Sequence, residues 1–379
     1  MREQVLSPIK GRLVGKDEIV EVLGIALTAG ENAFLLGPPG TGKSALVHEM
    51  AASLRGRSFD YLLTRFTEPS ELFGPFDLRR LRDGDLVTNT DGMLPEADFV
   101  FLDELLNANS AILNSLLLAL NERVFRRGKE TVPLPMLMAV GASNRLPEDD
   151  ALAALYDRFL LRIHCDNVEH SRLGEVLDAG WRREQTTAIQ PVMSIDEVRV
   201  LQHAVNHVDL STIAEAYAGL ILRLREAGMS VSDRRAVRLQ RVVAASAVIC
   251  GRSQGEISDL WVLRYIWDTP AQIEPIASHV DAIVNQAVDV DAQSDGDSPA
   301  APSASLFSHP MADRQQTPDP EHLLTLLDAV AQDPAAPTAP TVLVTLAARV
   351  EWVTSEESRQ ALKQRIEEVR ALLPAANRA

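Results

Sequence analysis

The sequence is poor in cysteine, in basic residues and in long apolar runs. It has two cysteines, Cys165 and Cys250, in 379 residues, and their separation matches neither a disulfide framework nor a zinc-ligand spacing. Reading His164 and Cys165 as a zinc pair leaves the metal short of ligands. So few cysteines suit a reducing compartment, and we expect a cytoplasmic protein.

The deficit of basic charge disfavours further classes. The chain has 37 Lys and Arg against 53 Asp and Glu, a net charge of −16. Proteins that bind nucleic acid usually show a basic balance or a basic stripe, and anionic membrane surfaces attract basic segments. No apolar run approaches the roughly 18 residues of a transmembrane helix, and the opening "MREQVLSPIKGR" has no apolar signal core. We therefore expect no membrane insertion and no specific nucleic-acid partner.

The hydrophobic content of 46% is enough for two or three domains. Within 1–166, apolar strand-like runs alternate with helical runs, and this alternation predicts an α/β domain with a parallel sheet. The strands are nearly all apolar, as expected when both faces of a sheet are buried. The predicted strands are 33–37, 59–66, 98–104, 137–144 and 159–165, and the predicted helices between them are 43–56 and 109–125.

The rest of the chain reads as helical, with one interruption. Residues 167–287 are predicted to form a helical domain, with a capping box from Ser194 to Glu197 and a helix that begins after Ser232. Residues 288–318 are rich in Asp, Ser, Pro and Ala, which predicts a linker. Residues 319–379 return to helical periodicity, and their apolar residues form either a small core or a docking surface for a partner.

The most specific motif is "GPPGTGKS" at 37–44, which fits G-x-x-x-x-G-K-[ST] without a mismatch. Its glycines allow the backbone N–H groups to surround phosphate, and the following helix adds its dipole. Lys43 reaches the outer phosphates and Ser44 offers a hydroxyl to magnesium. The spacing predicts a site for a nucleoside triphosphate with Mg²⁺. Such a loop does not read the base, so both ATP and GTP stay open at this point.

Three further segments accompany this loop. "DFVFLDE" is an apolar strand that ends in Asp103, placed for the metal, and Glu104, placed to activate water. "AVGASNRL" ends a strand at Asn144, whose amide can hold water or phosphate. "ALYDRFLLRI" places Arg158 at the end of a short helix. Taken singly, these segments also fit a solvated acidic turn, an asparagine turn and a surface ion pair.

The order of these segments resembles AAA+ ATPases, more closely the MoxR family, and within that family the RavA branch. Matching segments run from "LVGKDEIVEVLG" to "VSDRRAVRL", over about residues 10–240. The resemblance implies a P-loop AAA+ core followed by an all-helical lid. It also implies a hexameric ring that hydrolyses ATP to remodel a protein, often one with a von Willebrand type A domain.

The resemblance also implies a role for each site residue. Val14 and Gly15 contact the adenine, Asn144 is sensor 1, Arg158 is an arginine finger that acts on a neighbour's nucleotide, and Arg234 is sensor 2. The Walker B residues are Asp103, a metal ligand with Ser44, and Glu104. The Walker A and adjoining nucleotide-binding positions are Gly37, Pro38, Pro39, Gly40, Thr41, Gly42, Lys43, Ser44 and Ala45.

Two assignments stay open in the sequence. Many relatives carry proline where this chain has Asp233, and Arg235 follows directly, so either Arg234 or Arg235 is sensor 2, acting within its own subunit or across to a neighbour. The family also places a hairpin insert at about 71–94. There Phe73, Phe76 and Leu78 either grip a partner or pack as a connector, and "RRLR" at 79–82 is a basic grip or a solvated face.

Two functions from different classes follow. The first is an ATP-driven remodeller of proteins, as the resemblance implies. The second is a nucleic-acid motor of the same clade, which the acidic balance disfavours and salt-dependent DNA binding would favour.

Overall fold

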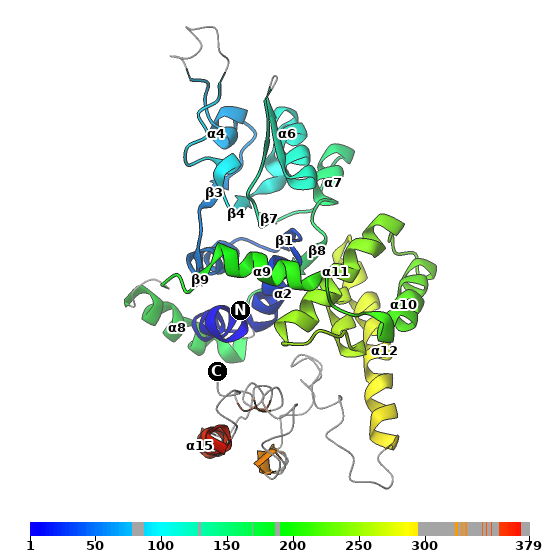
Figure 1. The fold of residues 1–379 in the computed structure, drawn as a ribbon. Coiled ribbons are helices and arrows are strands. Elements are labelled where there is room, and N and C mark those ends of the chain that lie inside the picture. The colour runs from blue at the N-terminus through cyan, green and yellow to red at the C-terminus, as the bar shows by residue number, and fades with distance from the viewer. Residues whose placement is uncertain are drawn as a thin grey trace. The chain divides into compact units, whose positions relative to one another are not determined.

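A computed structural model describes residues 1–77, 87–127, 130–168, 170–185 and 190–294 (Figure 1). In the carboxyl-terminal part it describes 323, 324, 327, 328, 330, 331, 343, 346, 350 and 356–372. The chain divides into two compact units, Met1–Ile283 and Val284–Ala379. The larger unit holds every residue that the motifs single out.

A five-stranded parallel sheet forms the centre of the larger unit, with strand order β3-β4-β7-β1-β8. Strands β1 and β7 are buried along their whole length, as their apolar sequences predict. All five strands were predicted, and the α/β class with a parallel sheet is confirmed. The strands are β1 (Ala33–Leu36), β3 (Ser58–Leu62), β4 (Phe99–Asp103), β7 (Met138–Ser143) and β8 (Leu161–His164).

Helices follow the strands as the alternation predicts, although two end earlier than expected. The first of these ends at Ala52, and the next residues form a two-residue strand, β2 (Leu54–Arg55), paired with β9 (Met193–Ser194). Helix α6 begins at Asn109, whose side chain accepts from the N–H groups of the first turn. The core helices are α1 (Ser7–Arg12), α2 (Asp17–Ala29), α3 (Lys43–Ala52), α4 (Pro69–Phe73), α6 (Ser110–Glu122) and α7 (Asp150–Tyr156).

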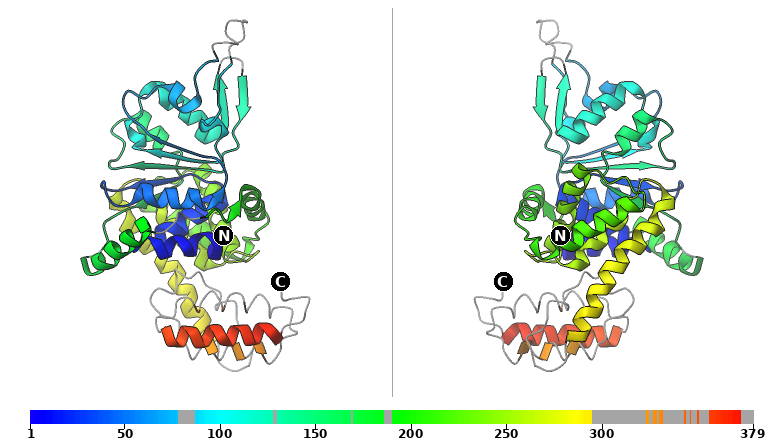
Figure 2. Two further views of the ribbon diagram at one scale, coloured as in Figure 1. Left: turned by 90° about the vertical axis from the view of Figure 1, so that its left-hand side faces the viewer. Right: turned by 90° about the vertical axis from the view of Figure 1, so that its right-hand side faces the viewer.

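Two hairpins project from the same side of the sheet (Figures 1 and 2). One is an antiparallel pair, β5 (Val124–Arg127) and β6 (Glu130–Pro133), where the sequence predicted the end of a helix. Val124, Phe125 and Val132 suit a strand better than a helix, and this β-propensity was the overlooked signal. The other is the insert, whose base pairs residues 75–77 with residues 87–89.

The helical part follows β8 and contains the predicted caps. The Ser194–Glu197 capping box is present, and Ser232 accepts from the N–H of Arg235. Helices α2, α9 and α11 pack against one another and lie together in Figure 1. The helices are α8 (Leu173–Gln185), α9 (Ile195–Val205), α10 (Ala214–Glu226), α11 (Asp233–Ile249), the 3-10 segment η6 (Ile257–Tyr265) and α12 (Ile273–Ser294).

Helix α12 corrects the start of the predicted linker. It continues to Ser294 because the chain has neither proline nor glycine between 276 and 295. Residues 295–318 lie outside the described residues. In the smaller unit, α15 (Glu356–Leu372) contributes to an apolar cluster of Leu323, Leu327, Val330, Leu343, Leu346, Val350, Leu362, Ile366 and Val369. Among the described residues, no helix is both long and apolar enough to cross a membrane.

Candidate functional site

The candidate site lies at the carboxyl edge of the sheet. Strand β1 runs parallel to β7, and β7 runs parallel to β4, so the residues that follow these three strands meet at one edge. The phosphate-binding loop follows β1, the acidic pair ends β4, and Asn144 follows β7. The fold therefore brings the first three predicted motifs together.

The loop after β1 has the backbone that its glycines permit. Gly40 and Gly42 have φ of 81° and 82°, in the left-handed region that side chains disfavour. Gly37 lies against the end of β8, where an added Cβ would be 2.0 Å from the carbonyl oxygen of Cys165. Pro38 and Pro39 are exposed between them. Glycine is thus required at 37 for close backbone approach and at 40 and 42 for conformation.

The polar side chains of the loop point inward. Lys43 is 8% exposed, and its ammonium donates to the carbonyl oxygens of Gly37 and Pro38 at 2.8 and 2.9 Å. Thr41 donates to Pro38 at 3.0 Å. A buried ammonium at this place, beside the N-terminus of α3, provides the positive charge that a triphosphate needs.

The acidic pair connects directly to the loop. The hydroxyl of Ser44 donates to Asp103 at 3.0 Å, so the two predicted metal ligands are neighbours although 59 residues separate them. The N–H of Glu104 donates to the same carboxylate at 2.9 Å. Glu104 itself has φ of 49°, a left-handed conformation that is uncommon outside glycine and marks functional positions.

Glu104 has an environment that suits a base. Burial raises the pKa of its carboxyl above the usual range, and Asp103 raises it further, while Lys43 and Arg145 partly oppose the shift. The backbone of Asn144 hydrogen-bonds to this carboxylate. A half-buried carboxylate with a raised pKa beside a phosphate loop is a candidate general base.

Arg145 is a site residue that the sequence reasoning missed. Its guanidinium donates to Asn107 at 2.7 Å and to Glu148 at 2.7 Å. It therefore links the turn after β4 to the turn after β7, on either side of Glu104. The signal was its place directly after Asn144 in "ASNRL".

A pocket of about 420 Å³ lies on the outer side of the loop. The predicted Val14 and Ala45 line it, whereas Gly15 lies behind this wall, against Val168. The other wall comes from residues 167–183, which the sequence reasoning did not assign to the site. The full lining is Arg12, Leu13, Val14, Lys16, Gly40, Thr41, Gly42, Ala45, Asn167, Val168, His170, Leu173, Val176, Ala179, Gly180 and Arg183.

Arg158 lies at the opposite edge of the sheet. Strands β1 and β8 are parallel, with Ala33 beside Leu161. Arg158 precedes the start of β8, whereas the phosphate loop follows the end of β1, so the two lie at opposite ends of the strands. The carbonyl of Arg158 accepts from Asn32, which immediately precedes β1, at 3.3 Å. The four residues of β1 span about 13 Å between these two ends. The structure thus separates Arg158 from the loop of its own chain.

The two arginines that open α11 differ in environment. Arg235 is 8% exposed and donates to Ser230, Ile266 and Asp268 within the helical part. Arg234 donates instead to Asn121 at the end of α6, at 2.8 Å, and Arg158 donates to the same Asn121 oxygen at 3.4 Å. Arg158 and Arg234 therefore share an acceptor, away from the other predicted site residues.

The two described phenylalanines of the insert also differ in environment. Phe73 is 2% exposed and stacks on Phe125 with ring centroids 5.3 Å apart, so of its two predicted roles it fits the packed connector and not the gripping residue. Phe76 is 36% exposed, in a bridge with Thr88. Leu78 and the basic cluster 79–82 lie outside the described residues.

The described residues contain no group of three or more His, Cys, Asp or Glu side chains arranged for a metal ion. His164 pairs with Asp166 at 3.0 Å, and Cys165 is buried, which raises the pKa of its thiol to about 11.

Comparisons with known proteins match this architecture. Residues 1–203 match a family described as the MoxR domain in the MoxR-vWA-beta-propeller ternary systems, and residues 210–280 match the AAA lid domain. Two uncharacterised proteins of Methanocaldococcus jannaschii are similar. One is 34% identical over 75% of this chain and 74% of its own length, and the other is 32% identical over 75% and 76%.

Two further proteins resemble parts of the chain. The chaperone MoxR1 of Mycobacterium tuberculosis is 27% identical over 43% of each chain. A crystal structure of a protein from Cytophaga hutchinsonii that is described as an ATPase superposes with a TM-score of 0.57 over 73% of this chain and 84% of its own, at 21% identity. That likeness confirms the fold.

Proposed function

Because the chain belongs to the MoxR family of AAA+ ATPases, we propose that it hydrolyses ATP in a ring of identical subunits to remodel a partner protein. The observation that carries the proposal is the contact between Ser44 and Asp103, with Glu104 directly after it. This contact joins the phosphate loop to the acidic strand, and Glu104 has the raised pKa that a base requires.

ATP is the substrate that this site fits best. The pocket beside the loop has Leu13, Val14 and Val168 in its walls, an environment for a flat base, and Gly40, Gly42 and Lys43 lie where the phosphates would follow. The family assignment favours the adenine nucleotide. Gly15 has φ of 70°, and a Cβ added there would come within 3.2 Å of Val168 of the pocket wall, so glycine at this position lets the chain pass close to the pocket.

A hydroxyl and a carboxylate at hydrogen-bond distance are the donor set that magnesium prefers, with water and phosphate completing its shell. Ser44 and Asp103 would hold the ion, and its chemistry would be to neutralise charge on the phosphates. Glu104 would accept the proton of the attacking water, and Asn144, whose backbone contacts Glu104, would orient that water or the phosphate.

Arg158 and Arg234 would act on the nucleotide of a neighbouring subunit. Both lie beside Asn121 at the edge of the sheet opposite their own phosphate loop, so neither is placed to act within its own chain. An arginine that reaches across an interface stabilises charge that develops on the transferred phosphate. We assign sensor 2 to Arg234, because Arg235 is buried and already occupied by acceptors of the lid.

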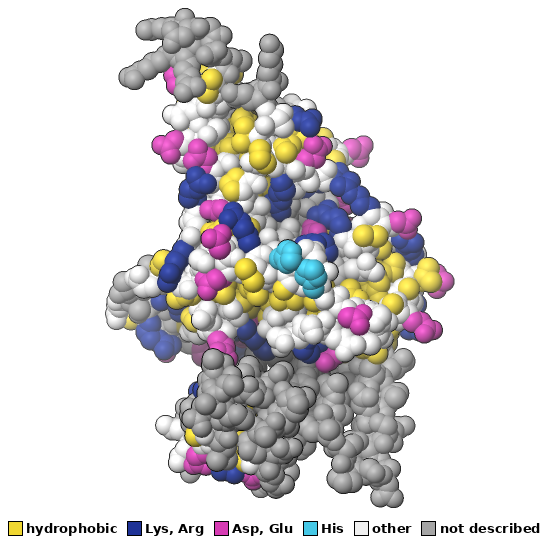
Figure 3. Space-filling view, viewed as in Figure 1, with side chains coloured by type: hydrophobic (Ala, Val, Ile, Leu, Met, Phe, Trp, Pro, Cys, Tyr) yellow, Lys and Arg dark blue, Asp and Glu magenta, His cyan; other side chains and the backbone are white. Residues whose placement is uncertain are grey.

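A hexameric ring would give each active site one such neighbour. The partner is, on this proposal, a protein with a von Willebrand type A domain, because the matching family is described from MoxR-vWA-beta-propeller systems. The assignment of the chain to the RavA branch of the MoxR family stays a prediction within this proposal. The face shown in Figure 3 mixes basic and acidic side chains. Together with the net charge of −16, this gives no support for extending the proposal to nucleic acid.

The test compares two variants of the site. Glu104→Gln is expected to bind ATP nearly as the unmodified protein does but to hydrolyse it at least about a hundredfold more slowly, the size of a general-base contribution. Lys43→Ala is expected to weaken ATP binding itself. Binding of a fluorescent ATP analogue and phosphate release, measured on both variants, separate the two steps. Normal turnover by Glu104→Gln would overturn the assignment of the base.

A further inference from the structure

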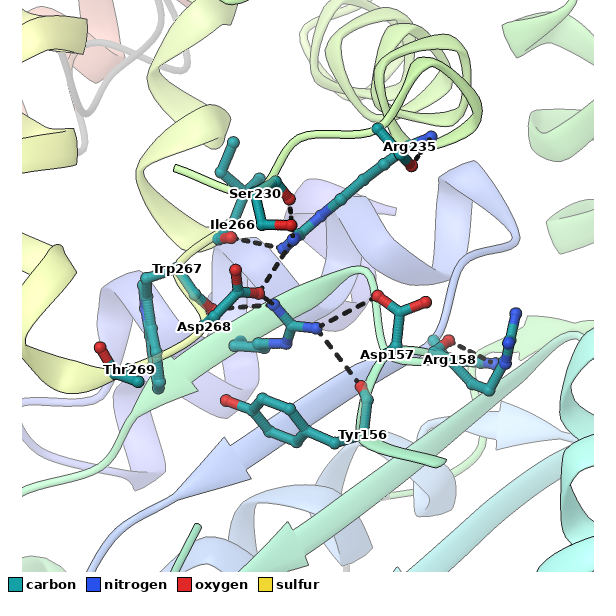
Figure 4. Close-up of polar contacts among 12 residues, drawn as sticks. Tyr156, Asp157, Arg158, Ser230, Arg235, Ile266, Trp267, Asp268 and Thr269 are labelled. Carbon is teal, nitrogen blue, oxygen red and sulfur yellow. Dashed lines mark hydrogen bonds and ion pairs between the residues drawn. The ribbon is translucent and has the colours of Figure 1, made fainter. Parts of the chain in front are cut away.

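Two pairs of arginines connect the sheet to the lid. Arg158 precedes β8 and Arg162 lies within it, and Arg234 and Arg235 open α11. Arg158, which is half-buried, and the exposed Arg234 donate to Asn121, whereas the buried Arg162 and Arg235 donate to Asp268. Figure 4 shows Arg158, Arg235 and Asp268 in this junction. The two pairs are therefore joined twice, through Asn121 and through Asp268.

The buried junction is densely bonded. Arg162 is 1% exposed, and its guanidinium donates to the carboxylate of Asp268, to the carbonyl of Trp267 at 3.0 Å and to that of Tyr156 at 3.5 Å. The same guanidinium lies 4.3 Å from the centre of the Tyr156 ring. Arg235 donates to the same Asp268 oxygen at 2.9 Å, and also to Ile266.

One carboxylate oxygen thus faces two buried guanidinium groups. Without it, two like charges would be left close together in a poorly solvated place, which is costly. A second carboxylate, Asp157, lies 3.9 Å from Arg162 but is largely exposed. Asp268 therefore dominates the charge balance that holds β8 of the core against the lid.

Each buried arginine is also connected through the chain to one of the arginines that donate to Asn121. Arg235 directly follows Arg234 on α11, so anchoring Arg235 fixes the first turn of the helix from which the Arg234 side chain extends. Arg162 holds the carbonyl of Tyr156 and approaches Asp157, the two residues before Arg158. A shift at Asp268 would consequently reach both Arg158 and Arg234.

We propose that Asp268 is a positioning residue: by accepting from Arg162 and Arg235 together, it keeps Arg158 and Arg234 on one rigid surface for the neighbouring subunit's nucleotide. This inference rests on the proposed function, in which those two arginines act across an interface. It adds that the core and the lid present them as one unit.

The first measurement is the ATPase kinetics of Asp268→Asn. The variant keeps its own phosphate loop and nucleotide pocket, so its KM for ATP is expected to stay within about twofold of the unmodified protein. Its kcat is expected to fall at least about tenfold, as for misplaced catalytic groups. Asp259→Asn is the matched control. Asp259 is fully buried in the same lid and accepts from Arg252 and Ser246, both also in the lid. It is expected to lower thermal stability but to keep kcat within about twofold.

Mixing experiments then locate the defect. Lys43→Ala subunits carry intact arginines, so adding them to Asp268→Asn subunits should restore part of the hydrolysis, as adding them to Arg158→Ala subunits should. Asp268→Asn mixed with Arg158→Ala should restore nothing, because both lack the arginine side of the interface. Arg235→Lys, which keeps the charge but cannot reach all three acceptors, should behave as Asp268→Asn and serves if that variant does not fold.

The outcomes are distinct. If Arg158→Ala and Lys43→Ala fail to complement, action across the interface is wrong, and both the proposed function's arrangement and this inference fall. If they complement but Asp268→Asn is rescued by Arg158→Ala instead of by Lys43→Ala, Asp268 serves its own nucleotide site and this inference alone is overturned. An equal loss of kcat in Asp259→Asn would show a general lid defect and also overturn it.

Discussion

At the scale of single residues, Glu104 combines an unfavourable conformation with an unfavourable environment. Its left-handed backbone and its half-buried carboxylate, whose pKa is raised by burial, both oppose folding. Residues held in this way concentrate at functional sites because function is retained at the expense of stability.

Glu104→Gln is therefore expected to raise the melting temperature at neutral pH. The folded-state pKa of Glu104 is raised, so ionisation destabilises the folded protein at every pH above that value. As the pH falls through the raised pKa towards the ordinary glutamate value, both states become protonated and the advantage of glutamine disappears. Differential scanning fluorimetry from pH 4 to pH 8 measures this difference. A constant difference across the range would mean that burial of the charge is not its cause.

At the scale of elements, the two hairpins on one side of the sheet are joined at their base. Phe73 of α4 stacks on Phe125 of β5 and is buried, whereas Phe76, three residues later, is 36% exposed. The insert is thus anchored by one aromatic residue and presents another. We propose that the insert is the element that transmits motion to a partner, since switch elements move as units when the γ-phosphate is lost.

The two phenylalanines are expected to respond differently to alanine. Phe76→Ala should keep basal ATP hydrolysis within about a few-fold, as expected far from the phosphates, but impair remodelling of a partner with a von Willebrand type A domain. Phe73→Ala should lower the free energy of unfolding by about 3–5 kcal/mol, because it leaves a cavity in the core. ATPase rate, partner remodelling and urea unfolding are measured on both. Retention of remodelling by Phe76→Ala would place the working surface elsewhere.

At the scale of the whole molecule, the proposed function implies that one chain holds an incomplete catalytic site. The phosphate loop follows β1, whereas Arg158 precedes β8 at the other end of the strands and shares Asn121 with Arg234. A head-to-tail arrangement, which closes into a ring, would bring the arginine edge of one subunit to the loop edge of the next.

The ATPase activity per subunit is accordingly expected to rise with protein concentration and to reach a plateau once subunits associate. Phosphate release over a dilution series, with sedimentation velocity on the same samples, measures both quantities. Arg158→Ala serves as the control, and it should associate normally while remaining slow at every concentration. A specific activity that stays constant down to the monomer would show that each chain is complete.

The contiguous motifs could be predicted from the sequence because their chemistry is local. The glycines at 40 and 42, Lys43 and Ser44 are determined by backbone conformation and spacing within eight residues. The apolar strands ending at Asp103 and Asn144 follow from burial on both faces of a parallel sheet. Likewise, the caps at Ser194 and Ser232 depend on one turn of helix.

Tertiary structure decided the features that depend on residues far apart in the chain. Arg234 and Arg235 have the same side chain and adjacent positions, and only packing against Asn121 and Asp268 distinguishes them. The stacking of Phe73 on Phe125 and the pocket wall at 167–183 also arise between distant segments. No local pattern encodes such contacts, because each exists only after the sheet has brought its two partners together.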